Sequence, residues 1–119
     1  MALEWVQRAL LKSLGFAPYP ATLNLRPAAQ KDASAWERVQ REMKGIELPP
    51  VNGGFCRAQL FLVQIMMAAQ TGSRTVRGAI LLPEVTDYPK DKIEVVAPVR
   101  LKDSLGVRDG DELMLEFVH

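Results

Sequence analysis

The chain has 119 residues, of which 48% are hydrophobic and 24% charged, and this length allows one globular domain with a real core. Fifteen lysines and arginines against fourteen aspartates and glutamates give a formal net charge of +1, so no overall field attracts nucleic acid or an anionic membrane. With one cysteine, Cys56, and one histidine, His119, the chain excludes an internal disulfide, a zinc site of two thiolates and conventional Ser-His-Asp or Cys-His catalysis.

No stretch of the chain approaches the roughly 18 apolar residues that a membrane-spanning helix needs. The first residues lack the basic flank, apolar core and small-residue cleavage site of a secretory signal. We therefore expect a cytoplasmic protein whose partners are neither membranes nor nucleic acids. Any anion site must be local.

The first expected element is an amphipathic helix over residues 2–14, because apolar residues recur there at spacings of three and four. Gly15 is a typical helix stop, and the proline-rich connector 16–20 keeps the chain extended. Residues 22–26 alternate apolar and polar side chains, which predicts a short strand that Pro27 ends.

A second helix is expected to begin at Asp32 or Ser34 and to end near Lys44, because Ser34 and Glu37 have the spacing of a capping box. The apolar stripe of this helix consists of Ala33, Trp36, Val39 and Met43. Residues 45–54 contain three glycines and two prolines, which predicts a loop.

The second half of the chain is rich in expected strands. Residues 55–69 are so apolar that they predict a long strand buried on both faces or bent across a barrel. Turn residues at 71–74 lead into a strand over 75–82, which predicts a hairpin, and residues 93–96 form a further short strand. The aromatic residues that we assign to the core rather than to ligand stacking are Trp5, Trp36 and Phe61.

The last expected elements are a short helix over 100–105, stopped by Gly106, and a strand over 112–118. In that strand Leu113, Leu115 and Phe117 share one face. Several strands are expected, and the expected helices lie at the start of the chain and in the connections between strands. This order favours a mainly β protein over a doubly wound α/β fold. We expect a small barrel or an α+β sheet.

Two neutral oxygen donors, Thr22 and Asn24, lie two residues apart on the first expected strand, so both would project from one side. Magnesium takes oxygen ligands and commonly combines a few protein groups with substrate phosphates, so the pair could complete the shell of a nucleotide-bound ion. These residue types are also ordinary on an exposed strand face. The residues alone leave both interpretations open.

Glu94 is the one charged residue in an apolar strand. Such a carboxylate either points to solvent or serves as a hydroxyl acceptor or general base, and Thr86 and Asp87 just upstream could reach the same space. Arg100 and Lys102 open the short helix, where cationic groups could bind phosphate or simply face water.

The order of these signals along the chain resembles a known family. Residues 14–24, Leu-Gly-Phe-Ala-Pro-Tyr-Pro-Ala-Thr-Leu-Asn, are similar to the Leu-Gly-Phe-x-Pro-Tyr-x-Gly-Thr-Leu-Asn motif of the archaeal CTP-dependent riboflavin kinases. A second block, comprising residues 79–83, Thr86, 93–102 and 109–111, is similar to the C-terminal half of that family. Residues 28–54 show no match.

The resemblance implies one domain over residues 1–119, a small six-stranded barrel of the cradle-loop kind, with 28–54 as a divergent helix and loop insertion. It implies that the 5′-hydroxyl of riboflavin attacks the γ-phosphate of CTP, giving FMN and CDP. Magnesium would accompany the nucleotide, and no tightly bound organic cofactor is expected.

Residue by residue, the resemblance assigns magnesium binding to Thr22 and Asn24, and flavin binding to Thr86 and Glu94. The segment that it assigns to the nucleotide consists of Val99, Arg100, Leu101 and Lys102. The resemblance places Glu94 beside the ribityl hydroxyl, which phosphoryl transfer requires to be positioned for attack. Glu94 is therefore our candidate catalytic base.

The sequence also departs from the family. A strand and a Gly-x-Gly-x-Gly-like loop that cradles the nucleotide precede the first helix in the family, whereas this sequence begins almost at that helix. The barrel could therefore be one strand short, with an open edge for a second copy of the chain. Ala21 stands where the family has glycine, and Asp87 where it tends to have an aromatic residue.

Three functions stay open on these grounds. The chain could be a CTP-dependent riboflavin kinase with a rebuilt nucleotide site. It could be a binding module for a flavin or another small ligand, derived from that family without catalysis. It could also be an interaction subunit that assembles through the barrel edge.

Overall fold

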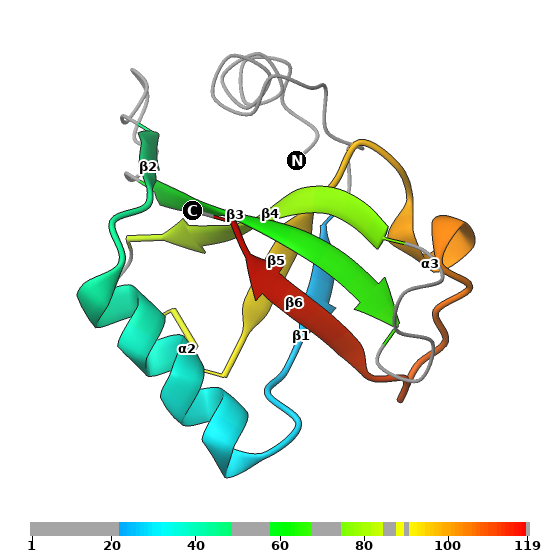
Figure 1. Cartoon of the computed structure of the whole chain (residues 1–119), viewed down its shortest axis with the longest axis horizontal. Helices are drawn as coiled ribbons and strands as arrows, with labels where there is room; N and C mark the ends of the chain where they lie inside the picture. The colour runs from blue at the N-terminus through cyan, green and yellow to red at the C-terminus, as the bar shows by residue number, and fades with distance from the viewer. Residues whose placement is uncertain (1–21, 49–57, 68–74, 85–87, 90, 119) are drawn as a thin grey trace.

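The computed structural model describes residues 22–48, 58–67, 75–84, 88–89 and 91–118, which are the coloured parts of Figure 1. Several predicted features lie outside these residues, namely the helix over 2–14, the connector 16–20, the turn 71–74 and the side chains of Trp5, Cys56 and His119.

Strands dominate the described part of the chain, as predicted. They are β1 (Leu23–Leu25), β2 (Ile46–Leu48), β3 (Ala58–Met67), β4 (Thr75–Pro83), β5 (Ile93–Val96) and β6 (Leu113–Phe117). The two helices are α2 (Gln30–Glu42) and α3 (Leu101–Ser104). The mainly β prediction with flanking helices is therefore confirmed.

All six strands form one antiparallel sheet in the order β1-β5-β4-β3-β2, and β6 also pairs with β3. Since β4 occupies one edge of β3 along nearly its whole length, β2 and β6 share the other edge. Ile46 of β2 lies opposite Leu60, and Phe117 of β6 lies opposite Val63. Within the described residues β1 and β6 do not pair, so the sheet is not closed into a barrel.

One strand was missed. Residues 46–48 belong to the predicted loop 45–54 but form β2. Three residues cannot make a strand by their own propensity, and the open edge of β3 supplies the partners that stabilise this one. Gly45, directly before β2, allows the close approach, because a Cβ there would lie 3.0 Å from the backbone oxygen of Leu60.

The start of α2 was also predicted wrongly. The helix begins at Gln30 rather than at Asp32 or Ser34, and its N-cap, Ala29, makes no side-chain cap. The backbone oxygen of Ala29 accepts the first hydrogen bonds, and Asp32 lies in the first turn, where its negative charge favours the positive end of the helix dipole. The helix ends at Glu42, before Lys44, because Met43 is extended.

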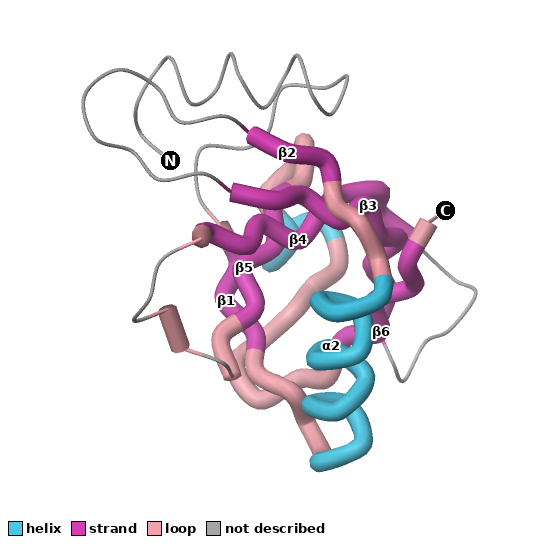
Figure 2. The backbone as a smooth tube through the Cα atoms, turned by 90° about the vertical axis from the view of Figure 1, so that its left-hand side faces the viewer, coloured by secondary structure: helices cyan, strands magenta, loops and turns pink. Residues whose placement is uncertain are grey.

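One face of the sheet carries the main core, which α2 and α3 cover. Figure 2 shows α2 running beside β3 and β6. Trp36 of α2 is 5% exposed and packs edge-on against Phe61 and stacked against Phe117, with ring centroids 5.6 and 6.3 Å apart. The assignment of Trp36 and Phe61 to the core is confirmed.

The opposite face of the sheet is buried as well. Leu60, Ala79 and Val96 are fully buried there and form a second, smaller cluster. Both faces of β3 are thus buried or half-buried along its length, as its largely apolar sequence predicted. In β6 the alternation is likewise confirmed, because Leu113, Leu115 and Phe117 pack on the main core.

Gly78, in the middle of β4, is a position where only glycine fits. A Cβ there would overlap the backbone oxygen of Val96 in β5 and lie 2.9 Å from Cδ1 of Ile65. Since the Val96 oxygen belongs to the sheet, the strand would have to shift. We expect Gly78→Ala to lower the free energy of unfolding by about 1–3 kcal/mol, measured by chemical denaturation.

Gly106→Asn is the matched control for this substitution. A Cβ at Gly106 meets no heavy atom within 4 Å, and asparagine tolerates the positive φ of 68°. A loss of stability in Gly106→Asn as large as in Gly78→Ala would contradict the close approach of β4 and β5.

Candidate functional site

The pairing of β1 with β5 brings two predicted site residues together. Asn24 lies directly opposite Glu94, and their neighbours Leu23 and Val95 also pair. Because side chains alternate along a strand, Asn24 and Glu94 share one face of this ribbon, whereas Leu23 and Val95 face the main core. The predicted magnesium ligand and the predicted catalytic carboxylate are therefore cross-strand neighbours.

The carboxylate of Glu94 does not simply point to solvent, since its side chain is only 16% exposed. Tyr88 Oη donates a hydrogen bond of 3.1 Å to Glu94 Oε1. Lys92 Nζ forms an ion pair of 3.1 Å with the same oxygen and lies 5.6 Å from the centroid of the Tyr88 ring. The three side chains form a closed triangle of contacts.

Tyr88 keeps its proton in this environment. Burial, followed by the charge of the nearby Glu94 carboxylate and the hydrogen bond to it, raises the pKa of Tyr88 well above its ordinary value of 10.0. The hydroxyl is therefore a permanent donor to Glu94 at physiological pH.

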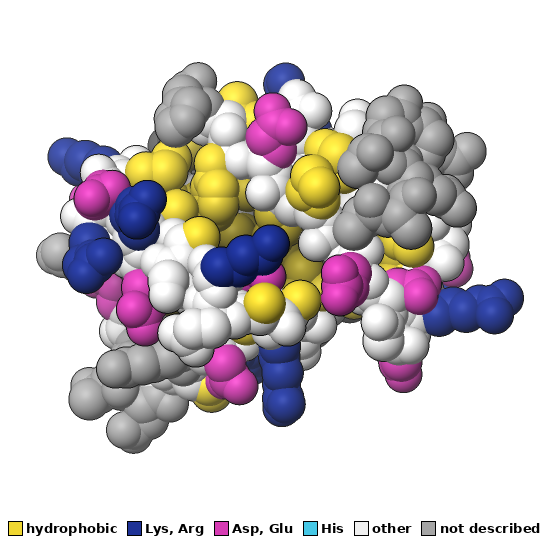
Figure 3. All heavy atoms as spheres, turned by 60° about the horizontal axis from the view of Figure 1, so that its bottom comes forward, with side chains coloured by type: hydrophobic (Ala, Val, Ile, Leu, Met, Phe, Trp, Pro, Cys, Tyr) yellow, Lys and Arg dark blue, Asp and Glu magenta, His cyan; other side chains and the backbone are white. Residues whose placement is uncertain are grey.

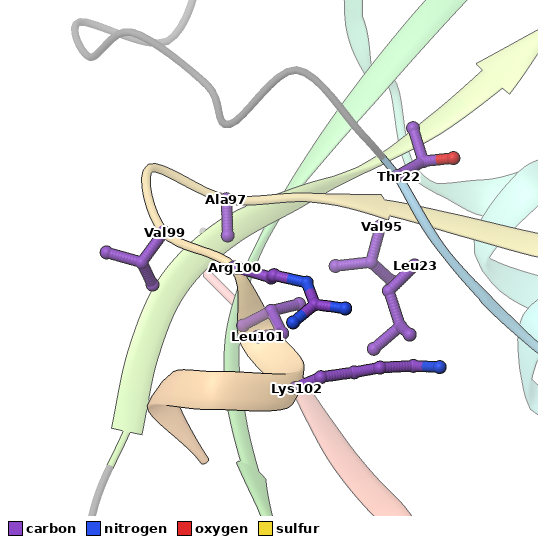
Figure 4. Close-up of a pocket in the computed structure, with 8 residues that line it drawn as sticks. All are labelled: Thr22, Leu23, Val95, Ala97, Val99, Arg100, Leu101 and Lys102. Atoms are coloured by element: carbon purple, nitrogen blue, oxygen red, sulfur yellow. The ribbon is translucent and has the colours of Figure 1, made fainter. Parts of the chain in front are cut away.

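A pocket of about 210 Å³ lies beside β1 and the start of α3. Its lining comprises Thr22, Leu23, Val95, Ala97, Val99, Arg100, Leu101 and Lys102 (Figure 4). Figure 4 shows the Arg100 and Lys102 side chains extending in the same direction from the start of α3. One pocket therefore combines the whole predicted nucleotide segment with Thr22, and gives it an apolar wall and two cations.

Each cation of the pocket has an exposed partner. Arg100 Nη1 lies 3.0 Å from Asp103 Oδ1, and Lys102 Nζ lies 3.5 Å from Asp109 Oδ1. The acidic partners are 71% and 98% exposed, and exposed pairs of this kind contribute at most about 1 kcal/mol. An incoming anion could therefore replace either carboxylate at little cost.

The predicted site residues do not all meet in one place. Thr22 lines the pocket, but Asn24 and Glu94 are not among its described lining residues. Leu23 and Val95 line the pocket, and Asn24 and Glu94 are their neighbours on β1 and β5, so the pocket and the Glu94 triangle lie beside the same pair of strands. Thr86 and Asp87 lie outside the described residues.

Sequence reasoning missed Tyr88 and Lys92. Neither has a spacing that marks a site, because both precede β5 in a connection rather than in a periodic element. The available signal was weak: an aromatic residue and a cation within six residues of a carboxylate in an apolar strand.

No group of three or more His, Cys, Asp or Glu side chains that could hold a metal occurs in the described residues. Among the same residues, no helix is long and apolar enough to cross a membrane. Charges of both signs are interspersed around exposed hydrophobic side chains on the face in Figure 3, in keeping with the net charge of +1.

Comparison with known proteins bears on the meaning of this arrangement. A family model described as "Domain of unknown function DUF120", with the short name CTP-dep_RFKase, matches residues 1–117. A protein of Aeropyrum pernix named riboflavin kinase is 41% identical over 114 residues, which cover 93% of this chain and 80% of the relative.

Two further relatives named riboflavin kinase are longer. The Pyrobaculum islandicum protein is 37% identical over 98% of this chain and 52% of its own length, and the Archaeoglobus fulgidus protein is 34% identical over 99% and 48%. The chain thus spans about half the length of several of the curated relatives that it matches. Taken with the family match over nearly all its residues, this similarity shows that the chain belongs to the CTP-dependent riboflavin kinase family.

Proposed function

We propose that this chain transfers a phosphoryl group from CTP to the 5′-hydroxyl of riboflavin, giving FMN and CDP. The observation that carries the proposal is the pocket lined by Thr22, Arg100 and Lys102, which lies beside the paired strands that carry Asn24 and Glu94. The names of the relatives and of the family model support the choice of substrates.

The pocket supports a role in phosphate binding. Arg100 and Lys102 would neutralise phosphate charge once Asp103 and Asp109 are displaced. At about 210 Å³ the pocket lies below the ~300–1,000 Å³ typical of whole-ligand pockets, so it would take part of a nucleotide, such as its phosphate groups.

The donor set suits magnesium. The hydroxyl of Thr22 and the amide oxygen of Asn24 are hard, neutral ligands, and a magnesium ion commonly takes few protein groups and completes its shell with water and phosphate oxygens. When bound with the nucleotide, the ion would neutralise charge on the transferring phosphoryl group. We propose Thr22 and Asn24 as its protein ligands.

Glu94 would act at the flavin, together with Thr86. In the proposed step the ribityl 5′-oxygen forms a bond to the γ-phosphorus while the bond from that phosphorus to the bridging oxygen breaks, and CDP leaves with the electron pair. The hydroxyl proton would pass to the Glu94 carboxylate, which is already an acceptor for Tyr88 and Lys92.

The remaining expectations belong to the same proposal. Residues 1–119 would form one domain, in which 28–54 is a divergent insertion. The protein would act in the cytoplasm without nucleic acid or membrane, and a homo-oligomer through an open edge of the barrel stays a prediction.

The test is a titration of riboflavin fluorescence with the purified protein, followed by addition of CTP and magnesium and chromatography for FMN. We expect quenching, then FMN above the enzyme-free control. In the Arg100→Ala/Lys102→Ala variant the KM for CTP should rise at least about tenfold, because two charge-assisted contacts to phosphate are lost. Riboflavin binding should be unchanged.

The matched control is Lys31→Ala/Arg38→Ala, which removes two exposed cations from α2, outside the pocket. An equal rise of KM in this control would show a general charge effect instead of a phosphate site. Quenching without FMN would favour the binding module, and the absence of both would leave the interaction subunit.

A further inference from the structure

The triangle of Tyr88, Lys92 and Glu94 has an asymmetry. Both donors bind the same carboxylate oxygen, Oε1, each at 3.1 Å. No described group bonds to Oε2. The carboxylate thus has one oxygen fully engaged by the protein and one that remains able to accept.

Two donors on one oxygen fix the orientation of a carboxylate. The terminal torsion of a glutamate is broad, so a lone side chain on a strand would sample many orientations. Here Tyr88 lies in the connection before β5, and Lys92 is the residue directly before that strand. Because Lys92 also lies over the Tyr88 ring, each donor restrains the other.

We propose that Tyr88 and Lys92 are positioning residues that hold Glu94 through its Oε1 atom. The other oxygen, Oε2, then accepts a hydrogen bond from a hydroxyl of the ribityl chain. The inference rests on the proposed function, because the flavin is the ligand that it names. It adds two residues to the site and makes Glu94 an oriented acceptor for a polyhydroxyl chain.

A double-mutant cycle tests whether Tyr88 acts through Glu94. Tyr88→Phe removes one hydroxyl and keeps the ring under Lys92, so it should weaken riboflavin binding about three- to tenfold, because Oε1 then keeps only one of its two donors. The KM for CTP should stay unchanged, and the variant should still unfold in one cooperative transition. In a Glu94→Ala background Tyr88→Phe should have no further effect on riboflavin affinity.

The role of Lys92 is tested by substitutions that remove or keep its positive charge. Lys92→Met should weaken riboflavin binding to a similar degree, and Lys92→Arg should restore most of the affinity. Arg26→Met is the matched control, because Arg26 is a largely exposed cation that pairs with Asp91 at 3.9 Å instead of with Glu94. This control should bind riboflavin as the wild type does.

The outcomes separate the inference from the proposed function. If wild-type protein does not bind riboflavin, the proposed function fails and the flavin acceptor role fails with it. If the wild type binds riboflavin but Tyr88→Phe binds equally well, or its effect persists in Glu94→Ala, only the positioning role is overturned. The carboxyl ¹³C shift of Glu94 in the ligand-free protein should differ between wild type and Tyr88→Phe, and identical shifts would overturn the contact itself.

Discussion

Replacement of Trp36 by alanine is expected to lower the free energy of unfolding by about 3–5 kcal/mol. Trp36 is the buried residue of α2, and its indole ring contacts Phe61 of β3 and Phe117 of β6. The substitution would leave a cavity where the helix joins two strands. Since a domain of this size has about 5–15 kcal/mol in total, the loss should be visible in urea denaturation followed by circular dichroism.

Two variants control for this effect. Trp36→Phe keeps an aromatic ring at the site and should cost less than the alanine substitution. Glu37→Ala changes the next residue of α2, whose side chain is exposed, and should stay within about 0.5 kcal/mol of the wild type. A loss under about 1 kcal/mol in Trp36→Ala would mean that α2 does not anchor the main core.

Replacement of Asn24 by alanine should weaken the binding of CTP in the presence of magnesium by about tenfold or more. Asn24 is exposed on β1 and contributes no core contact, so its removal should spare the fold. The proposed reason is the loss of one of two protein oxygens for the ion. Calorimetric titration with CTP, with and without magnesium, measures the effect.

The same titration contains its own control. Without magnesium, Asn24→Ala and the wild type should bind CTP equally, because the amide acts only through the ion. Asn24→Asp keeps an oxygen ligand and should retain the magnesium dependence. An affinity for CTP with magnesium that is unchanged in Asn24→Ala would remove Asn24 from the ion site.

Much of the sheet could be predicted because its strands carry their own signal. The largely apolar sequence of β3 reflects burial on both of its faces, and the alternation in β6 reflects burial on one face. β2 could not be found in this way, because its pairing depends on the edge of β3, which is distant in sequence. The start of α2 was also missed. The capping-box spacing at Ser34 predicted a start there, but the helix begins about one turn earlier, at Gln30.

The candidate site was predictable as residue types but not as an arrangement. The sequence marked Thr22, Arg100 and Lys102, and the structure brings all three to one pocket. Local spacing holds no information on the register that places Asn24 opposite Glu94, since that register depends on long-range pairing. Tyr88 and Lys92 became visible only with the side-chain contacts of Glu94.

The unequal length of the strand ladders has a consequence for motion. β3 pairs with β4 along nearly its whole length and with β2 and β6 on its other edge, whereas β1 pairs, among the described residues, through a short ladder with β5 alone. Local opening follows the weakest cooperative unit, so we expect β1 to separate from β5, and Asn24 from Glu94, while the centre of the sheet stays intact. A ligand bound across this ribbon would raise the free energy of that local opening and slow amide exchange there first, before it affects the global stability of the domain.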